Sequence, residues 1–379
     1  MTRDSLKFPG PGALNVMCHA VMVRAVAIVS LALLAGCSNL SYYMQSVGGQ
    51  LDIWRRERPI EEVLKDPATP EALRRKLATI LEIRAYASRE LGLPDNRSYR
   101  QYADLGRPYV VWNVFATREF SVEPEKWCFL MVGCVSYRGY FAKEDADAFA
   151  AETARLDHDV YVGPVPAYST LGYFTDPVLN TFVHYPDYEI ARLLFHELSH
   201  QLVYVRDDTV FNESFAVAVE QEGVRRWLGR SGDAQQSAAF ERFQGIRTAF
   251  MQLVHKHRDE LAALYRSDLA PDAMRVRKSE ILRALGEEYR SVKERDWGGY
   301  AGYDPWFARK PNNAQLASIA LYSQMVPAFQ ELLRREGGDL AMFYRAVKQL
   351  AALPKDDREA KLQALAPDII FRPTKENEK

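Results

Sequence analysis

The carboxyl-terminal half of this 379-residue chain is a nearly unbroken series of helical patterns. Apolar residues recur there at every third or fourth position, which is the spacing of one face of an α-helix. The stretches with this spacing are 189–204, 209–228, 233–265, 271–294, 312–336 and 339–352. A glycine-rich stretch at 297–305 interrupts the series. The chain must therefore fold so that several long helices each bury one face.

The preceding part of the chain combines strand patterns with shorter helical patterns. Strand candidates, rich in β-branched and aromatic residues, are 108–120, 135–141, 159–165 and 179–184, and the helical candidates are 60–91 and 143–156. Strands followed by helices predict an α+β fold, in which a small mixed sheet with helices precedes a mostly helical core. We expect one domain over 59–370, strand-rich over about 105–185 and helical over about 189–352, and a disordered tail over 371–379.

The composition is that of a large folded domain without a charged surface for nucleic acid. Hydrophobic residues make up 47% of the chain and aromatic residues 12%, which is enough to bury a substantial core. The 49 Lys and Arg residues balance 50 Asp and Glu residues, for a formal net charge of −1. We therefore expect no nucleic-acid partner, and no pattern predicts an oligomeric state.

The amino terminus has the pattern of a secretory signal. An apolar run at 21–34 contains Arg24 near its start and is followed by Ala35-Gly36-Cys37. The run is shorter than the ~20 residues that a transmembrane helix needs. We expect a signal peptide over 1–36, with Met17 and Met22 as alternative starts, and a tether over 37–58. An uncleaved signal anchor is the alternative.

The end of this segment resembles the lipobox of bacterial lipoproteins. The matching residues are Leu34-Ala35-Gly36-Cys37. The resemblance implies cleavage before Cys37 and lipidation of its thiol, so that the mature chain is anchored in a membrane and faces the periplasm. Ser38 follows the cysteine, and in lipoproteins a residue other than Asp at this position favours the outer membrane.

Two cysteines remain for the folded part of the chain. Cys18 precedes the expected cleavage point and Cys37 would carry lipid, which leaves Cys128 and Cys134. An exported protein folds in an oxidising compartment, so we expect these two to form a short-loop disulfide. The alternative is a pair of buried free thiols.

The segment His196-Glu197-Leu198-Ser199-His200 matches the pattern HExxH. On a helix, residues i and i+4 lie on one face, so both imidazoles can reach one metal ion. Glu197 would then lie beside the metal and could accept a proton from a bound water. Alternatives are a capped surface helix, a structural zinc site and a pair of histidines in the core.

Glu213, 13 residues after His200, is the candidate for a third ligand. A catalytic zinc takes three protein ligands and leaves one position for water. Residues 201–208 can end the first helix and turn, and Asp208 or Thr209 can cap a second helix. A glutamate on the inward face of an apolar helix is costly unless it is paired or bound to a metal. The alternative is a glutamate that faces solvent.

The segment Asn212-Glu213-Ser214-Phe215-Ala216, with Glu220 after it, looks like the NExFA…E segment of zinc aminopeptidases in the gluzincin clan. The resemblance implies that His196, His200 and Glu213 bind one Zn²⁺ and that Glu197 is the general base. Glu220 and Asn212 are candidates for residues that support the ligands.

Together with the lipobox and the WC…GC loop, these motifs resemble a family of bacterial lipoproteins described as zinc aminopeptidases, over most of the mature chain. Two departures stand out. The gap between His200 and Glu213 is shorter than in thermolysin-like gluzincins, and the GxMEN motif that grips a substrate amine is absent upstream. Exopeptidase character therefore rests on the resemblance.

Three further residues are candidates for substrate chemistry. Tyr303, beside the Asp304-Pro305 turn, and Tyr300 are candidate hydrogen-bond donors to an oxyanion. Asp176 is a candidate anchor for the substrate amine, and 178–184 is a candidate edge strand for an extended peptide. We expect a zinc-dependent peptidase, by the resemblance an aminopeptidase, which hydrolyses peptide bonds with a metal-activated water at the periplasmic face of a membrane. The alternatives are a zinc endopeptidase with a similar site and a non-enzymatic lipoprotein scaffold with structural or no metal.

Overall fold

The computed structural model describes residues 41–129, 133–167, 169–320 and 325–367, which divide into two compact units at Ile53 and Trp54. In the first unit the described residues, 41–53, are helical and belong to a helix over 41–56. The expected signal segment, Cys37 and the tail at 371–379 lie outside the described residues. Among the described helices, none has the length and apolar character needed to cross a membrane.

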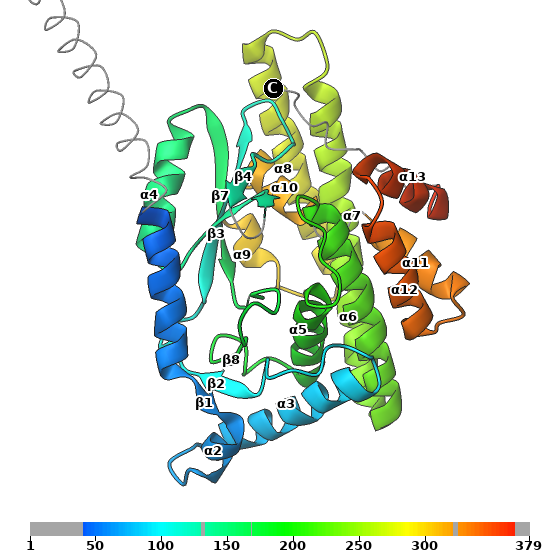
Figure 1. The fold of residues 1–379 in the computed structure, drawn as a ribbon. Coiled ribbons are helices and arrows are strands. Elements are labelled where there is room, and N and C mark those ends of the chain that lie inside the picture. The colour runs from blue at the N-terminus through cyan, green and yellow to red at the C-terminus, as the bar shows by residue number, and fades with distance from the viewer. Residues whose placement is uncertain (1–40, 130–132, 168, 321–324, 368–379) are drawn as a thin grey trace, which may run out of the picture. The chain divides into compact units, whose positions relative to one another are not determined.

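A three-stranded antiparallel sheet forms the centre of the strand-rich part (Figure 1). Its middle strand β3 (Val111–Arg118) pairs with β6 (Arg138–Tyr140) and β7 (His158–Val165). The register with β7 runs from Val111 opposite Val165 to Arg118 opposite His158. Helices α4 (Lys143–Ala154) and α10 (Asn313–Ala320) both pack against this sheet, as expected from its apolar residues.

Two smaller sheets complete the strand-rich part. One contains β1 (Arg58–Pro59), β2 (Gln101–Ala103) and β8 (Val178–Leu179), and the other is the hairpin of β4 (Trp127–Phe129) and β5 (Gly133–Val135). The strand expected at 179–184 is wrong beyond Leu179, because the backbone turns there with bonds from Phe182 and Val183 to the Leu179 carbonyl. The Asn180 side chain accepts from Leu105 N and donates to the Arg107 carbonyl, which fixes this turn against the β2–β3 connection.

The rest of the unit is helical, so the α+β prediction is confirmed. The helices other than α4 and α10 are α2 (Ile60–Lys65), α3 (Glu71–Arg89), α5 (Asp187–His200), α6 (Thr209–Ser231), α7 (Ala234–Leu264), α8 (Pro271–Arg295), α9 (Asp304–Phe307), α11 (Val326–Arg335), α12 (Leu340–Ala351) and α13 (Lys355–Leu365). The single helix expected at 312–336 is instead two helices, since Pro327 lies at the start of α11, where proline is well tolerated. Figure 1 shows α6 and α7 as long neighbouring helices, with α11 to α13 on their outer flank.

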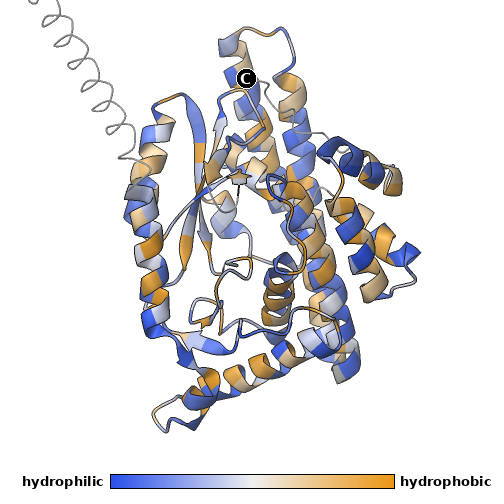
Figure 2. Cartoon of the chain, in the orientation of Figure 1, coloured by the Kyte–Doolittle hydropathy of each residue, from blue (hydrophilic) through white to orange (hydrophobic). Residues whose placement is uncertain are grey.

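Helix α5 is the apolar centre of this part of the molecule. Leu194, Phe195 and Leu198 are fully buried, and Figure 2 shows both hydrophobic and hydrophilic residues along the helix. It packs against α6 along much of its length and against α3. Gly223 of α6 permits this close approach, because a Cβ there would lie 2.7 Å from the Phe195 ring and 2.8 Å from Leu91. Two helices held this closely can present side chains to one shared site.

Candidate metal centre

The histidines of the HExxH segment occupy the last turn and a half of α5. The helix begins after Pro186, carries Asp187 and Glu189 in its first turn, and ends at His200. Acidic residues at the amino end and a histidine at the carboxyl end both suit the helix dipole. Because the two histidines are four residues apart, they project from the same face of α5.

A short connection brings the third residue back to the same place. Asp207 adopts a left-handed conformation with φ of 66°, and the Asp208 side chain caps α6 by accepting from Phe211 N. Asn212 is 2% exposed, and its side-chain amide both donates to and accepts from the Val205 backbone at 2.7 Å. Asn212 thus secures the connection, and Glu213 follows it on the buried face of α6.

His196, His200 and Glu213 form a buried group of potential metal ligands, with one ligand atom of each within 4.8 Å of the others. His196 Nε2 lies 3.2 Å from His200 Nε2 and 3.2 Å from Glu213 Oε2, and His200 Nε2 lies 3.8 Å from Glu213 Oε1. Bonds of about 2.0–2.1 Å to a tetrahedral zinc separate its ligand atoms by roughly 3.3 Å. The three side chains therefore fit a zinc-sized cation without rearrangement.

The electrostatics of the group also favour a cation. Burial lowers the pKa of His200 to about 4, which leaves a neutral imidazole with a lone pair. Burial acts on His196 in the same sense, but hydrogen bonds to the carboxylates of Glu213 and Glu220 outweigh it and raise its pKa to about 10. The negative potential that holds a proton on His196 is the potential that would attract a metal ion.

Glu197 lies beside this group with a carboxyl poised near neutrality. Burial is the largest cause, and together with the charges of Glu213 and Asp176 it raises the pKa of Glu197 to about 7 against the opposing effect of His196. A carboxyl group with a pKa close to the working pH is well suited to both accept and return a proton.

Glu220 is fully buried and forms a hydrogen bond with Nδ1 of His196, the ring nitrogen that does not face the ligand group. Its Oε2 accepts from His196 Nδ1 at 2.9 Å and from Arg192 Nη1 at 3.2 Å, and its Oε1 accepts from Arg247. The two guanidinium groups and His196 hold the pKa of Glu220 far below its usual range despite burial. The bond to Nδ1 leaves Nε2 of His196 directed at the ligand group.

The structure places the other candidate residues around the site as follows. The Tyr303 ring stacks on Phe250 with centroids 3.8 Å apart, and its phenol is close enough to Arg247 and Arg192 to be affected by their charges. The Tyr300 side chain lies over Gly302, where an added Cβ would lie 2.3 Å from the Tyr300 hydroxyl. Burial and the charge of Glu189 raise the pKa of Tyr300. Both tyrosines therefore lie on the side of the first turns of α5.

Asp176 is 3% exposed and organises a loop beside the site. Its carboxylate accepts hydrogen bonds from Thr170 N, the Ser169 hydroxyl and Gln201 Nε2. Burial raises its pKa to about 6. Since Gln201 directly follows His200, the loop of Asp176 is tied to the carboxyl end of α5.

Sequence reasoning missed Tyr204, which stands on the connection between α5 and α6. Burial and the nearby Glu213 carboxylate raise the pKa of Tyr204 to about 12, so the phenol stays protonated. Its position between the two motifs was the available signal. Arg192 could have been found as well, because it precedes His196 by four residues on the same face of α5.

The hairpin of β4 and β5, which a disulfide closes, packs against the connection between α5 and α6. Cys128 and Cys134 are joined by a disulfide, and the Cys134 backbone N–H donates to Asp207 Oδ1. Gly133 has φ of 77°, and a Cβ there would lie 2.4 Å from the Asp207 carboxylate. Glycine at this position thus permits the hairpin to pack directly on the turn that leads to Glu213.

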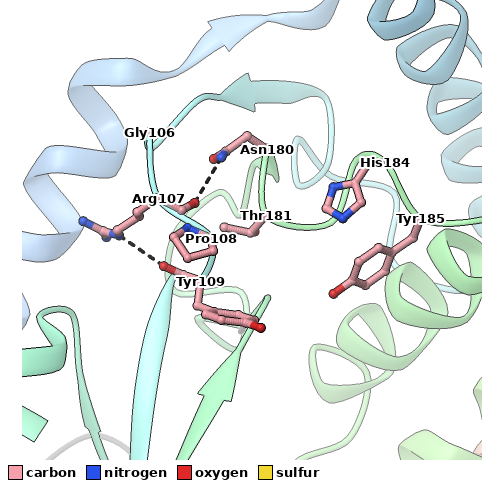
Figure 3. A pocket seen from close by; sticks show the side chains of 8 residues that line it. All are labelled: Gly106, Arg107, Pro108, Tyr109, Asn180, Thr181, His184 and Tyr185. Carbon is pink, nitrogen blue, oxygen red and sulfur yellow. Dashed lines mark hydrogen bonds between the residues drawn. The ribbon is translucent and has the colours of Figure 1, made fainter. Parts of the chain in front are cut away.

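A polar cavity of about 450 Å³ lies at the amino end of α5 (Figure 3). It is formed by the β2–β3 connection and the turn before α5, and its lining residues are Gly106, Arg107, Pro108, Tyr109, Asn180, Thr181, His184 and Tyr185. Asn180 donates to the Arg107 carbonyl and so ties these two loops together, and Thr181 donates to the Pro166 carbonyl after β7. The rings of Tyr109, His184 and Tyr185 surround the open space in Figure 3.

Comparison with known proteins gives one match. A family model described as "Putative aminopeptidase" matches residues 41–362, which include β3, the hairpin and the whole ligand group. No curated protein matches the chain, and no solved structure matches it.

Proposed function

As this chain belongs to the family described as putative aminopeptidases, we propose that it is a zinc-dependent aminopeptidase with a gluzincin-like site. The observation that carries the proposal is the convergence of His196 Nε2, His200 Nε2 and a Glu213 oxygen, with Glu197 beside them. Two imidazoles and one carboxylate are the donor set of catalytic zinc in peptidases, and they leave one coordination position open.

In the proposed mechanism the residues of the chain divide the work. His196, His200 and Glu213 would hold the zinc, which when bound would supply a Lewis acid for activation of a water and polarisation of the scissile carbonyl. Glu197 accepts the proton of the attacking water and returns it to the leaving amine. In the chain without metal, burial raises the pKa of Glu197 to about 7.

A neutral hydrogen-bond donor must also stabilise the oxyanion. We assign this role to Tyr204 in place of Tyr303 or Tyr300. The charge of the proposed ligand Glu213 affects the pKa of Tyr204. The pKa of Tyr303 is instead affected by Arg247 and Arg192, and that of Tyr300 by Glu189. Burial raises the pKa of Tyr204 to about 12, so its hydroxyl remains a donor at neutral pH.

Two variants test the metal and base assignments together. Glu197→Gln keeps all three ligands, so it should retain zinc and lose peptidase activity. His196→Ala removes a ligand, so it should lose both zinc and activity. Zinc content by elemental analysis and hydrolysis of a peptide amide are the measurements, and full activity in Glu197→Gln would show that the base is misassigned.

Action at a free amino terminus is tested with matched peptides. Asp176, buried beside Glu197, is the proposed anchor for the substrate amine, and opening of its loop would expose it. Purified protein should cleave a free peptide and spare the same peptide after N-acetylation. Equal cleavage of both would indicate an endopeptidase that uses the same zinc chemistry.

We also propose that the mature protein is a lipoprotein, anchored through Cys37 on the periplasmic side of the outer membrane. The support is the apolar run followed by Leu34-Ala35-Gly36-Cys37. Wild-type protein should incorporate labelled fatty acid and sediment with outer membranes. Cys37→Ala should abolish the labelling, and labelling that persists in this variant would exclude Cys37 as the anchor.

A further inference from the structure

The carboxylate of Glu220 connects the ligand group to a third helix. It is fully buried on α6 and has three partners: His196 and Arg192 on α5, and Arg247 on α7. Its Oε2 atom accepts hydrogen bonds from the two α5 residues, and its Oε1 atom accepts one from Arg247. Arg247 lies 27 residues beyond Glu220 and belongs to neither sequence motif.

We infer that Arg247 is a positioning residue for the metal centre, which acts through Glu220 to hold His196 in its metal-binding orientation. The inference rests on the proposed metal site and adds to it a residue from α7. In metal sites generally, a carboxylate that accepts from the outer nitrogen of a ligating histidine fixes the tautomer and ring orientation. Here that carboxylate is itself held by two arginines.

The geometry gives the two arginines different tasks. Arg192 lies one turn before His196 on α5, so it approaches Glu220 from the same helix as the ligand. Arg247 reaches Glu220 from α7 and anchors the other carboxylate oxygen. Without Arg247, Oε1 of a fully buried carboxylate would lose its charged partner, which is strongly unfavourable. Glu220 would then turn towards other donors and draw its Oε2 away from His196.

An aromatic pair lies near the Arg247 side chain. Tyr303, whose phenol senses the charges of both Arg247 and Arg192, stacks on Phe250 of α7. Phe250 lies three residues after Arg247 on the same helix. Arg247 therefore lies near this aromatic pair and donates to the Glu220 carboxylate.

The two histidines of the ligand group differ in the hydrogen bonding of their Nδ1 atoms. His196 Nδ1 has the Glu220 partner, whereas the buried Nδ1 of His200 has no hydrogen-bond partner among the residues that the structure describes. His200 is positioned by packing, and its side chain is 7% exposed. A change at Arg247 should thus alter one ligand of the three and weaken metal binding without abolishing it.

The test compares zinc affinity in Arg247→Met, Arg247→Lys and the matched control Arg258→Met. Arg258 is a second arginine of α7 with a carboxylate partner; it is buried and donates to Glu123 at 2.9 Å, whereas the Arg247 side chain is 16% exposed. Zinc affinity is measured on metal-depleted protein by competition with a chelator, and ligand geometry by the visible spectrum of the cobalt-substituted protein. Thermal unfolding of the metal-depleted proteins measures any purely structural contribution.

We expect Arg247→Met to raise the zinc Kd by about 10- to 100-fold and to shift the cobalt spectrum. Arg258→Met should keep the wild-type Kd and spectrum even if it lowers the melting temperature. Arg247→Lys keeps the charge and one donor, so its Kd should lie between those of the wild type and Arg247→Met.

Equal zinc affinity in Arg247→Met and Arg258→Met would overturn the inference, because Arg247 would then only stabilise the fold. If Arg247→Met does not fold, Arg247→Lys decides alone, and a wild-type Kd and cobalt spectrum in that variant would overturn it. Wild-type protein that binds no zinc would instead overturn the proposed metal site, and the role of Arg247 with it. The two failures are therefore distinguished by the wild-type measurement.

Discussion

At the scale of single residues, Tyr204 is the side chain whose loss should separate binding from chemistry. Its phenol stays protonated near Glu213, because burial raises its pKa to about 12. Tyr204→Phe should lower kcat by about 10²-fold, the usual cost of one oxyanion donor, with zinc content and KM little changed. Steady-state kinetics on one peptide substrate provide the measurement.

Tyr303→Phe and Tyr300→Phe serve as the matched controls for Tyr204→Phe. Their hydroxyls lie on the side of Arg247 and Glu189, so kcat should stay within about threefold of wild type. A loss of 10²-fold in Tyr303→Phe with normal Tyr204→Phe kinetics would return the donor role to Tyr303.

The grouping of the three candidate ligands was predictable from sequence because each residue depends on a local pattern. His196 and His200 share a helix face by spacing alone, and Glu213 follows on the next helix after a short turn. Arg247 and Tyr204 could not be assigned in this way. Arg247 reaches Glu220 only through the packing of α7 on α6, and one tyrosine among 20 carries no motif.

At the scale of elements, the contact of α5 with α6 depends on a missing side chain. Gly223→Ala gains about 1 kcal/mol of helix propensity, but its Cβ would lie 2.7 Å from Phe195 and 2.8 Å from Leu91. Overpacking of this kind costs about 1–3 kcal/mol, so we expect a net loss of stability and weaker zinc binding. Urea denaturation of the metal-depleted protein measures the former and chelator competition the latter.

Gly229→Ala on the same helix is the control. No atom lies within 4 Å of the Cβ position there, so only the propensity gain of about 0.5–1 kcal/mol should remain. If both glycine variants were equally stabilised, close packing at Gly223 would not be what sets the distance between α5 and α6.

The cap of α6 is braced by the last described helix of the chain. Arg358 of α13 donates to Asp208 Oδ2 at 2.6 Å and 3.1 Å, and both side chains are 4% exposed. Arg358→Leu leaves a buried carboxylate without its charge partner, which should cost about 3–5 kcal/mol in the free energy of unfolding. Chemical denaturation measures this loss.

A double variant distinguishes the ion pair between Arg358 and Asp208 from the capping of α6 by Asp208. Asp208→Asn keeps a capping side chain, so Asp208→Asn with Arg358→Leu should be less destabilised than the sum of the single changes. Strict additivity would show that Arg358 acts through its packing on Phe211, over whose ring its guanidinium lies at 5.2 Å.

Helices with strong apolar periodicity were predictable, and short paired segments were not. The bounds of α5 to α8 match the expected stretches within a few residues. The strands β1 and β2 are two and three residues long, and they are strands only because they pair with each other and with β8. Such pairing is a property of the folded chain and leaves no periodic pattern to detect.

At the scale of the whole molecule, the metal should contribute to stability. A cation that binds the folded chain alone stabilises it by about 2.7 kcal/mol at a free concentration of 100 Kd. For the unit from Trp54 onward this should raise the melting temperature by about 3–5 °C. Calorimetry with and without chelator tests it.

In His200→Ala the metal should not raise the melting temperature, because this variant lacks one of the proposed ligands. The same rise in His200→Ala and wild type would place the stabilising ion elsewhere on the protein.

The short connection between α5 and α6 has a consequence for the order of folding. All three candidate ligands lie within the 18 residues from His196 to Glu213, so closing the loop between them costs little chain entropy. Contacts between neighbours in sequence form early, and those from distant segments form late. We therefore expect the nascent α5–α6 hairpin to capture its cation first, and Arg247 to secure His196 only when α7 docks.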